Sequence, residues 1–289
     1  MNQDTDTRRV HLAGIVPVSG HSEESFGFPW HKSLQPIEKA YTAVERSIVE
    51  CAYAGCDTIW VVCDDNIQPL IKKILGDYIE NPYCLEKHLY VKYPSEHRKQ
   101  IPIFYTPIHP KDRDRRDSYG WSVLHGVLTS FIVSTKISKW LTPTKYYVSF
   151  PYGVYKPDEL RKYRSELTSK ESFYLSYKGK TVADGEYLGF TMSAKEYKEY
   201  VWNIKNNCSG GSRNIPLHER WSSKHFSLDK IFGCAIINEK NKREVNWYYK
   251  IDDWKSYKTY MSSDESSTLL KPSESMFSYH EYSKMKYGE

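Results

Sequence analysis

The chain has 289 residues, a formal net charge of +5 and a hydrophobic fraction of 39%. This length suits one large α/β domain or two small ones. The modest charge permits binding of small anions, but it does not argue for a nucleic-acid-binding protein. Tyrosine contributes 25 residues, and its ring buries a large area while keeping a polar end. The composition therefore predicts a folded globular protein.

The sequence favours a protein of the cytoplasm. Its N-terminal residues, MNQDTDTRR, lack the apolar run of a signal peptide. No segment approaches the roughly 20 apolar residues that span a bilayer. None of the six cysteines forms a CxxC pair, so we expect buried free thiols in a reducing compartment and no zinc site.

The first eighty residues predict strands that alternate with helices. Val10–Val18 is typical of a buried strand, and the loop that follows it, Ser19–Trp30, is long enough to be functional. Ile37–Ala54 has helical periodicity, with Gly55 placed to end the helix. The apolar run Thr58–Cys63 indicates a strand buried on both faces. With a further helix at 67–75, this order predicts a βαβα unit of Rossmann type.

In the rest of the chain, predicted strands and helices continue to alternate, and from about residue 172 the predicted strands become rich in aromatic residues. We expect strands at 101–108 and 145–150, and a helix at 119–135 that turns Val123, Val127, Phe131 and Ile132 inward. The fold class predicted is α/β: a Rossmann-like three-layer α/β/α sandwich with a mixed, mostly parallel sheet. We expect residues 1–262 to form one domain with two halves, 10–150 and 151–262, and residues 263–289 to form a polar C-terminal tail.

Several motifs in this framework resemble those of one enzyme family. The run Lys32–Ile37 matches the pattern Lys-x-Leu-x-Pro-Ile, and Ala54-Gly55, Val61-Val62 and Leu75-Gly76-Asp77 follow at similar spacings. In this respect the chain resembles the sugar nucleotidyltransferases, whose fold is of the nucleotide-diphospho-sugar transferase (GT-A) type. The resemblance implies transfer of a nucleotidyl group from a nucleoside triphosphate to a sugar phosphate or a similar phosphorylated small molecule, with release of pyrophosphate and with Mg²⁺ as cofactor.

The resemblance also assigns site residues. Lys32 is the expected catalytic residue, a fixed positive charge beside the α-phosphate. Small residues let backbone N–H groups approach phosphate oxygens closely, and the family often has Gly-Thr-Ala beside the base where this chain has Gly-Trp-Ser. The expected nucleotide-binding residues are Val18, Ser19, Gly20, His21, Ser22, Gly120, Trp121 and Ser122. The resemblance makes 10–150 the nucleotide-binding half and 151–262 the sugar or acceptor half, and Gly189 is expected on this substrate side.

The metal ligands depart from the family pattern. Ser149–Tyr152 stands where a metal-holding Asp is expected after the fourth strand, and Lys250 stands at the second acidic position. Three hypotheses remain open. Asp252 and Asp253 hold the ion together with the nucleotide's phosphates, or basic side chains replace the metal, or the fold persists without catalysis. A lost metal removes several kcal/mol of charge stabilisation.

Two alternatives to nucleotidyl transfer also remain open. One is a glycosyltransferase that uses a nucleotide-sugar, for which Asp112-Arg113-Asp114 has the spacing of an Asp-x-Asp metal motif. The other is an inactive nucleotide-binding or structural protein. Asp64 and Asp65 are better explained as helix caps than as metal ligands. The sequence leaves open whether the chain forms a homo-oligomer, and it gives no indication of nucleic-acid or membrane partners.

Overall fold

The computed structural model describes residues 10–20, 31–82, 100–109, 112, 118–207, 227–273 and 276–278. Its centre is an eight-stranded sheet with the order β11-β9-β10-β7-β1-β4-β6-β5. The strands of the sheet are β1 (Leu12–Pro17), β4 (Thr58–Cys63), β5 (Tyr78–Glu80), β6 (Gln100–Pro107), β7 (Lys145–Val148), β9 (Tyr174–Ser176), β10 (Phe190–Ser193) and β11 (Lys242–Glu244). Two small pairs lie outside it: β2 (Pro36–Glu38) with β3 (Tyr41–Thr42), and β8 (Gly153–Val154) with β12 (Tyr249–Lys250).

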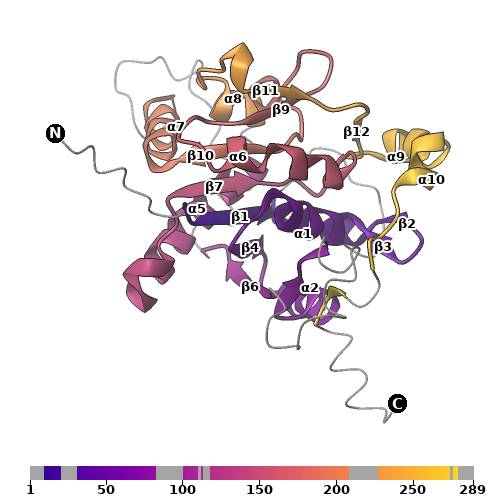
Figure 1. The fold of residues 1–289 in the computed structure, drawn as a ribbon, viewed down its shortest axis with the longest axis horizontal. Helices are drawn as coiled ribbons and strands as arrows, with labels where there is room; N and C mark the ends of the chain where they lie inside the picture. The colour runs from indigo at the N-terminus through magenta and orange to yellow at the C-terminus, as the bar shows by residue number, and fades with distance from the viewer. Residues whose placement is uncertain are drawn as a thin grey trace, which may run out of the picture.

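The centre of the sheet is parallel and its flanks are mixed. β1 pairs in parallel with both β4 and β7, and β4 pairs in parallel with β6. β10 runs antiparallel to β7 and β9, while β5 runs antiparallel to β6. The predicted α/β class with a mixed, mostly parallel sheet is confirmed. The carboxyl ends of the parallel strands therefore meet along one edge of the sheet, on the right in Figure 1.

Helices cover both faces of the sheet. The helices whose bounds the structure describes are α1 (Ala43–Ala54), α2 (Gln68–Leu75), α5 (Tyr119–Ile137), α6 (Arg164–Leu167), α7 (Ala194–Asn207), α8 (Leu228–Phe232), α9 (Trp254–Met261) and α10 (Asp264–Thr268). Short 3-10 helices are η1 (Lys32–Leu34), η4 (Lys139–Leu141), η5 (Pro157–Tyr163), η6 (Val182–Asp184) and η7 (Glu239–Asn241). Gly14 of β1 faces Cys51 of α1, whereas the neighbouring Ile15 faces Gly126 of α5. Because successive strand residues point to opposite faces, α1 and α5 lie on opposite sides of the sheet.

The first helix starts later than its periodicity predicts. Residues 36–42 form the β2–β3 hairpin, with Ala40 at a φ of +54°. α1 then begins at a capping box between Thr42 and Glu45, and it ends at Gly55 with a φ of +87°. The apolar run 58–63 coincides with β4, as expected.

α5 buries a different face from the one predicted. Val123 and Val127 are buried as expected, but Phe131 and Ile132 are 43% and 42% exposed. The buried stripe instead continues through Ser130 and Ser134, which lie on the same face of the helix as Val123 and Val127. The prediction was wrong for Phe131 and Ile132 because it followed apolarity alone, whereas small side chains let this helix lie close to the sheet.

Packing extends into the segment predicted as a polar tail. Lys271 forms a buried ion pair with Glu45 of α1 (2.7 Å). Met276 and Phe277 are buried, and the Ser278 hydroxyl accepts from the N–H of Asp77 (2.7 Å).

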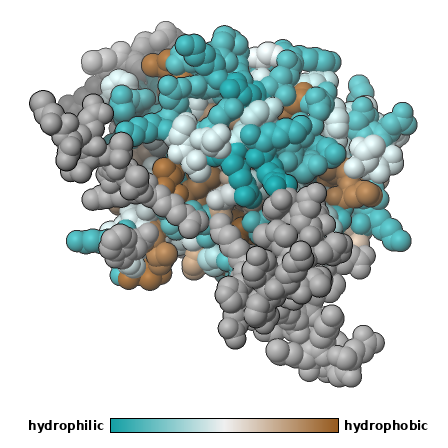
Figure 2. Space-filling view, in the orientation of Figure 1, coloured by the Kyte–Doolittle hydropathy of each residue, from teal (hydrophilic) through white to brown (hydrophobic). Residues whose placement is uncertain are grey.

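The face of the molecule shown in Figure 2 carries mostly hydrophilic residues, with hydrophobic residues in smaller groups. Among the described helices, none is both long and apolar enough to cross a membrane.

Candidate functional site

The loop that leaves β1 is fastened to the neighbouring strand and to α5. The N–H groups of Val18 and Ser19 both donate to the carbonyl of Val62 at 2.9 Å. The hydroxyl of Ser122 donates to the carbonyl of Ser19 at 2.6 Å. The backbone N–H groups of Val18 and Ser19 thus have partners within the fold. Any backbone N–H of this loop that contacts a phosphate therefore belongs to Gly20 or to a later residue.

Gly20 lies against the first turn of α5. Its φ is +146°, and a Cβ there would come within 2.6 Å of the backbone nitrogen of Tyr119. Both observations require glycine at this position. Of the other predicted loop residues, His21 and Ser22 lie outside the described residues, as do Arg113 and Asp114 of the Asp-x-Asp spacing.

The Gly-Trp-Ser run, residues 120–122, lies in the first turn of α5, whose N-cap is Ser118 and whose first residue is Tyr119. A Cβ on Gly120 would come within 2.3 Å of the Ile231 side chain, so this glycine lets α8 pack against α5. Trp121 is half-buried, and its backbone N–H donates to the Ser118 hydroxyl. The structure therefore places these residues beside the β1 loop, but it gives each of them a packing or capping contact within the fold.

Lys32 enters the site on the short helix η1. The preceding residue, His31, caps this helix: its Nδ1 accepts from the N–H of Ser33 (3.3 Å) and lies 2.8 Å from the Ser33 hydroxyl. Burial and the adjacent Lys32 ammonium lower the pKa of His31 to about 4, with Asp64 opposing them. The imidazole is therefore neutral at neutral pH and holds the backbone at Lys32.

Three tyrosine rings form the floor of the site. The centroid of Tyr119 lies 5.1 Å from that of Tyr152 and 5.8 Å from that of Tyr187. The Lys32 ammonium lies 5.0 Å from the centroids of both Tyr119 and Tyr152. Aromatic faces attract a cation, so Lys32 is held at the junction of two rings at the carboxyl edge of the sheet.

A second lysine contacts the third ring of this group. The Lys250 ammonium, from β12, is 5.0 Å from the Tyr187 centroid and 3.2 Å from Oδ2 of Asp252. Burial, with Asp252 and Glu186 nearby, raises the pKa of Tyr187. The tyrosine cluster (Tyr119, Tyr152 and Tyr187) thus contacts two ammonium groups from different halves of the chain.

The two candidate metal ligands have other partners. Asp253 is the N-cap of α9, and its Oδ1 accepts a hydrogen bond from the backbone N–H of Ser256 at 2.5 Å. Asp252 is ion-paired with Lys250. Within the described ranges, no group of three or more His, Cys, Asp or Glu side chains could hold a metal ion. This donor set, one carboxylate paired with an ammonium and one capping a helix, does not fit the all-oxygen octahedral shell of Mg²⁺.

α2 begins later than the predicted caps, Asp64 and Asp65. The N-cap of α2 is Ile67, which makes no side-chain hydrogen bond there. Asp64 contributes instead its backbone carbonyl, which accepts from the N–H groups of Ile67 and Gln68.

A buried charge network supports the β7 side of the site. Arg46 and Glu50 of α1 pair at 2.7 Å with fully buried side chains. Glu50 also accepts from the hydroxyls of Tyr147, Ser149 (2.7 Å) and Tyr155 (2.5 Å). Arg46 donates to the carbonyl of residue 150 at 2.8 Å. The network therefore fixes the backbone that leads from β7 to Tyr152.

Gly189 belongs to this network. Its N–H donates to the Tyr155 hydroxyl at 3.1 Å. A Cβ at this position would lie 2.2 Å from the Tyr147 hydroxyl and 2.8 Å from the Glu50 carboxylate. The absence of a side chain at residue 189 is what allows these groups to meet.

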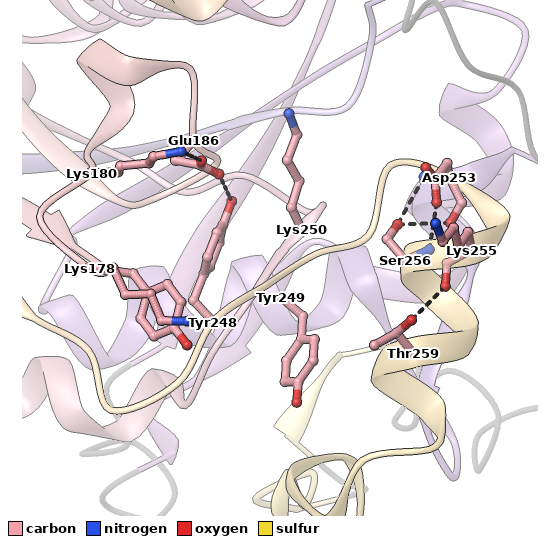
Figure 3. Close-up of a pocket in the computed structure, with 11 residues that line it drawn as sticks. Lys178, Lys180, Glu186, Tyr248, Tyr249, Lys250, Asp253, Lys255, Ser256 and Thr259 are labelled. Atoms are coloured by element: carbon pink, nitrogen blue, oxygen red, sulfur yellow. Dashed lines mark hydrogen bonds and ion pairs between the residues drawn. The ribbon is translucent and has the colours of Figure 1, made fainter.

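A cleft of about 460 Å³ opens beside Lys250, between the turn at 177–180 and α9. Figure 3 shows Lys178, Lys180 and Glu186 on one side and Lys255, Ser256 and Thr259 of α9 on the other. Tyr248 lies beside Lys178 and Glu186, with its hydroxyl donating to Glu186 at 3.2 Å, and Lys250 lies between the two sides. The lining carries four lysines and two carboxylates, which favours an anionic occupant.

Sequence reasoning missed the tyrosine cluster and this cleft. Tyr119, Tyr152 and Tyr187 come from segments far apart in the chain, so no local motif marks them. The one available signal was the Lys at position 250, where the family pattern has an acid. Cys51, Cys56 and Cys63 are buried free thiols, as expected, whereas Cys234 is exposed.

Comparisons with known proteins bear on the fold. No protein-family model matches the sequence, and no curated protein matches it closely. A structure described as a glucose-1-phosphate thymidylyltransferase from Bacillus anthracis, in complex with a sucrose, has a TM-score of 0.52 at 10% identity and covers 86% of this chain and 93% of that chain. Apo UDP-glucose pyrophosphorylase has a TM-score of 0.50 at 10% identity, covering 90% and 100%. A manganese complex of Rv0371c from Mycobacterium tuberculosis H37Rv has a TM-score of 0.43 at 11% identity, covering 88% and 99%.

These matches define the class first: the chain is an α/β protein with a Rossmann-like, mostly parallel sheet. More particularly, its fold is that of the sugar nucleotidyltransferases, in a divergent form.

Proposed function

We propose that the protein binds a nucleoside triphosphate and transfers its nucleotidyl group to a phosphorylated small molecule, with a sugar phosphate as the expected acceptor. The observation that carries this proposal is the position of Lys32. Its ammonium is held 5.0 Å from two tyrosine rings, at the carboxyl edge of a parallel sheet and beside the loop that leaves β1. In open α/β sheets, ligands bind outside the carboxyl ends of the strands.

The chemistry joins an acceptor phosphate oxygen to the α-phosphorus and breaks the bond from that phosphorus to the bridging oxygen, so pyrophosphate leaves. Negative charge rises on the α-phosphate oxygens as the acceptor approaches in line. A fixed ammonium at Lys32 stabilises that charge, and the rigid loop from Ser19 to Gly20 positions the nucleotide. Removing one such preorganised group costs roughly 10²–10³ in rate in other enzymes.

The two halves of the chain divide the substrates in this proposal. Residues 10–150 hold the nucleotide, and residues 151–262 hold the acceptor. The lysine-lined cleft of Figure 3 supports the second assignment, because it opens beside Lys250 and carries Lys178, Lys180 and Lys255. An acceptor phosphate is the kind of anion such a lining attracts.

The test is pyrophosphate release from a panel of nucleoside triphosphates and sugar phosphates, measured with Mg²⁺ and with EDTA. We expect release from at least one pair, and its loss in Lys32→Ala. The matched control is Lys195→Ala, a lysine of α7 whose side chain is 87% exposed. Absence of release across the panel would refute transfer. A nucleotide at 100 times its Kd adds about 2.7 kcal/mol to the free energy of unfolding. A rise in the unfolding temperature with a nucleotide would then identify a nucleotide-binding protein without this activity.

A further inference from the structure

The outer face of α5 and the short helix after it carry a group of exposed apolar side chains. Leu128, Phe131 and Ile132 are 42%, 43% and 42% exposed. Ile137, the last residue of α5, and Leu141 of η4 are 62% and 41% exposed. Of the eleven large apolar side chains that are exposed among the described residues, these five lie within 14 residues of chain. We call them the α5 patch. Single exposed apolar residues are ordinary on a protein surface, whereas a contiguous group marks an interaction site.

The inner face of α5 carries smaller side chains than its outer face. Gly126 packs against the side chains of Ile15 and Val62, and the buried stripe continues through Ser130 and Ser134. Large apolar side chains therefore point away from the sheet, which reverses the usual pattern of a helix with one covered face. Of the 19 residues of α5, Lys136 is the one Asp, Glu, Lys or Arg. A helix that is apolar all round is typically buried all round, so the outer face of α5 calls for a partner.

The α5 patch has the size of the apolar part of a protein interface. Five large apolar side chains, each about half exposed, offer on the order of 400 Å². A stable interface buries about 800 Å² on each partner, and roughly 57% of that area is apolar, or about 450 Å². The chain has no Asp or Glu from residue 118 to residue 157, so a partner that covers the patch buries no carboxylate with it.

We propose that the α5 patch is the centre of a homodimer interface, in which α5 packs antiparallel against α5 of a second copy of this chain. Leu128, Phe131 and Ile132 have the i, i+3, i+4 spacing of a helical stripe, and a twofold axis sets such a stripe against itself. The antiparallel arrangement puts the exposed Lys136 and Lys139 of the two copies at opposite ends of the interface. A bilayer fits less well, because segments that bind anionic lipid carry clusters of about four to eight basic residues.

This interface leaves the candidate site open. α5 begins at the carboxyl edge of the sheet, where Gly20 lies against Tyr119. It ends at the amino edge, on the left in Figure 1, where the N–H of Thr144 donates to the carbonyl of His11 at 3.0 Å. The α5 patch lies in the second half of the helix and in η4, so the inference is independent of the proposed function.

The experiment is sedimentation velocity of the full chain from about 1 to 100 µM. The variant is Ile132→Glu, which sets a charge in the patch and, four residues before Lys136, keeps a favourable helical pair in the monomer. The matched control is Leu70→Glu in α2, where the leucine is 44% exposed and Lys73 follows three residues later. We expect wild type to sediment as a dimer and Ile132→Glu to raise the dimer Kd at least about thirtyfold, as the loss of a hot spot does. Leu70→Glu should leave the Kd unchanged, and circular dichroism confirms that both variants are folded.

The other outcomes overturn the proposal. A wild-type chain that stays monomeric at the highest concentration has no such interface. A dimer that Ile132→Glu leaves within twofold of wild type uses another surface. A monomer that binds vesicles of phosphatidylcholine and phosphatidylserine, and loses them in Ile132→Glu, has a membrane and not a second copy on the α5 patch. Phe131→Ala gives a check that adds no charge: the Kd should rise about tenfold, and an unchanged Kd refutes the central place of this ring.

Discussion

Replacing Glu50 by glutamine tests the buried charge network. The carboxylate of Glu50 pairs with Arg46 at 2.7 Å and accepts from three hydroxyls, all inside the core. Glutamine keeps the size of the side chain but removes its charge, and its amide group turns a donor toward the donors of Arg46 or Ser149. The guanidinium of Arg46 is then buried without a counter-charge.

The expected cost follows from that loss. Breaking a buried pair by removing one partner destabilises proteins by roughly 3–5 kcal/mol, so we expect the free energy of unfolding to fall by about 4 kcal/mol in Glu50→Gln. Ser149→Ala, which removes one hydrogen bond to the same carboxylate, should cost roughly 1.5–3 kcal/mol. Urea unfolding followed by circular dichroism measures both, with an unchanged m-value as the check for two-state behaviour.

A double-mutant cycle sharpens the result. Arg46→Met removes the buried cation, so adding Glu50→Gln to it should cost less than in the wild-type background, with a coupling energy of up to about 3 kcal/mol. If Glu50→Gln costs less than about 1 kcal/mol and the two changes are additive, Arg46 and Glu50 are not coupled and the network does not hold the backbone after β7.

Two further predictions concern the approach to Lys32. Because the pKa of His31 is lowered from 6.5 to about 4, the unfolded chain binds the proton more readily, and stability should fall as the pH drops from about 6.5 to 4. The loss is at most about 3 kcal/mol, since His31 is partly exposed. Urea unfolding at pH 7 and 4.5 should show a smaller loss in His31→Gln, and an equal loss would contradict the assignment. Gly20→Ala places a methyl group 2.6 Å from a backbone nitrogen, whereas Gly179→Ala, also at positive φ, meets open space. We expect thermal unfolding to show a clearly larger loss for Gly20→Ala, and equal losses would refute the close contact.

The sequence predicted those helices and strands whose form is set by neighbouring residues in the chain. The apolar run 58–63 defines β4, since a strand buried on both faces needs no polar alternation. Gly55 ends α1 in the left-handed conformation that glycine favours. The β2–β3 hairpin was missed because apolar spacing through Ile37 and Ala40 is the same in a helix, and the pattern carries no information on the positive φ of Ala40.

The site was predictable only where a residue acts near its own sequence neighbours. Lys32 lies in a recognisable run, and the structure places it at the carboxyl edge of the sheet. Tyr119, Tyr152 and Tyr187 meet through long-range packing, which no local pattern encodes. The contact of Lys250 with the Tyr187 ring is long-range in the same way, whereas its ion pair with Asp252 joins residues only two apart in the chain.

The segment after β7 explains why an acid there would not by itself create a metal site. The hydroxyl of Ser149 donates to Glu50, and the carbonyl of Phe150 accepts from Arg46. The Phe150 ring packs against those of Tyr187 and Phe190, with centroids 5.7 and 6.4 Å away. An Asp at position 149 or 150 would therefore lie in the core, where an unpaired carboxylate is costly. The fold that holds Tyr152 against Lys32 is thus the same fold that removes the position for a metal-binding acid.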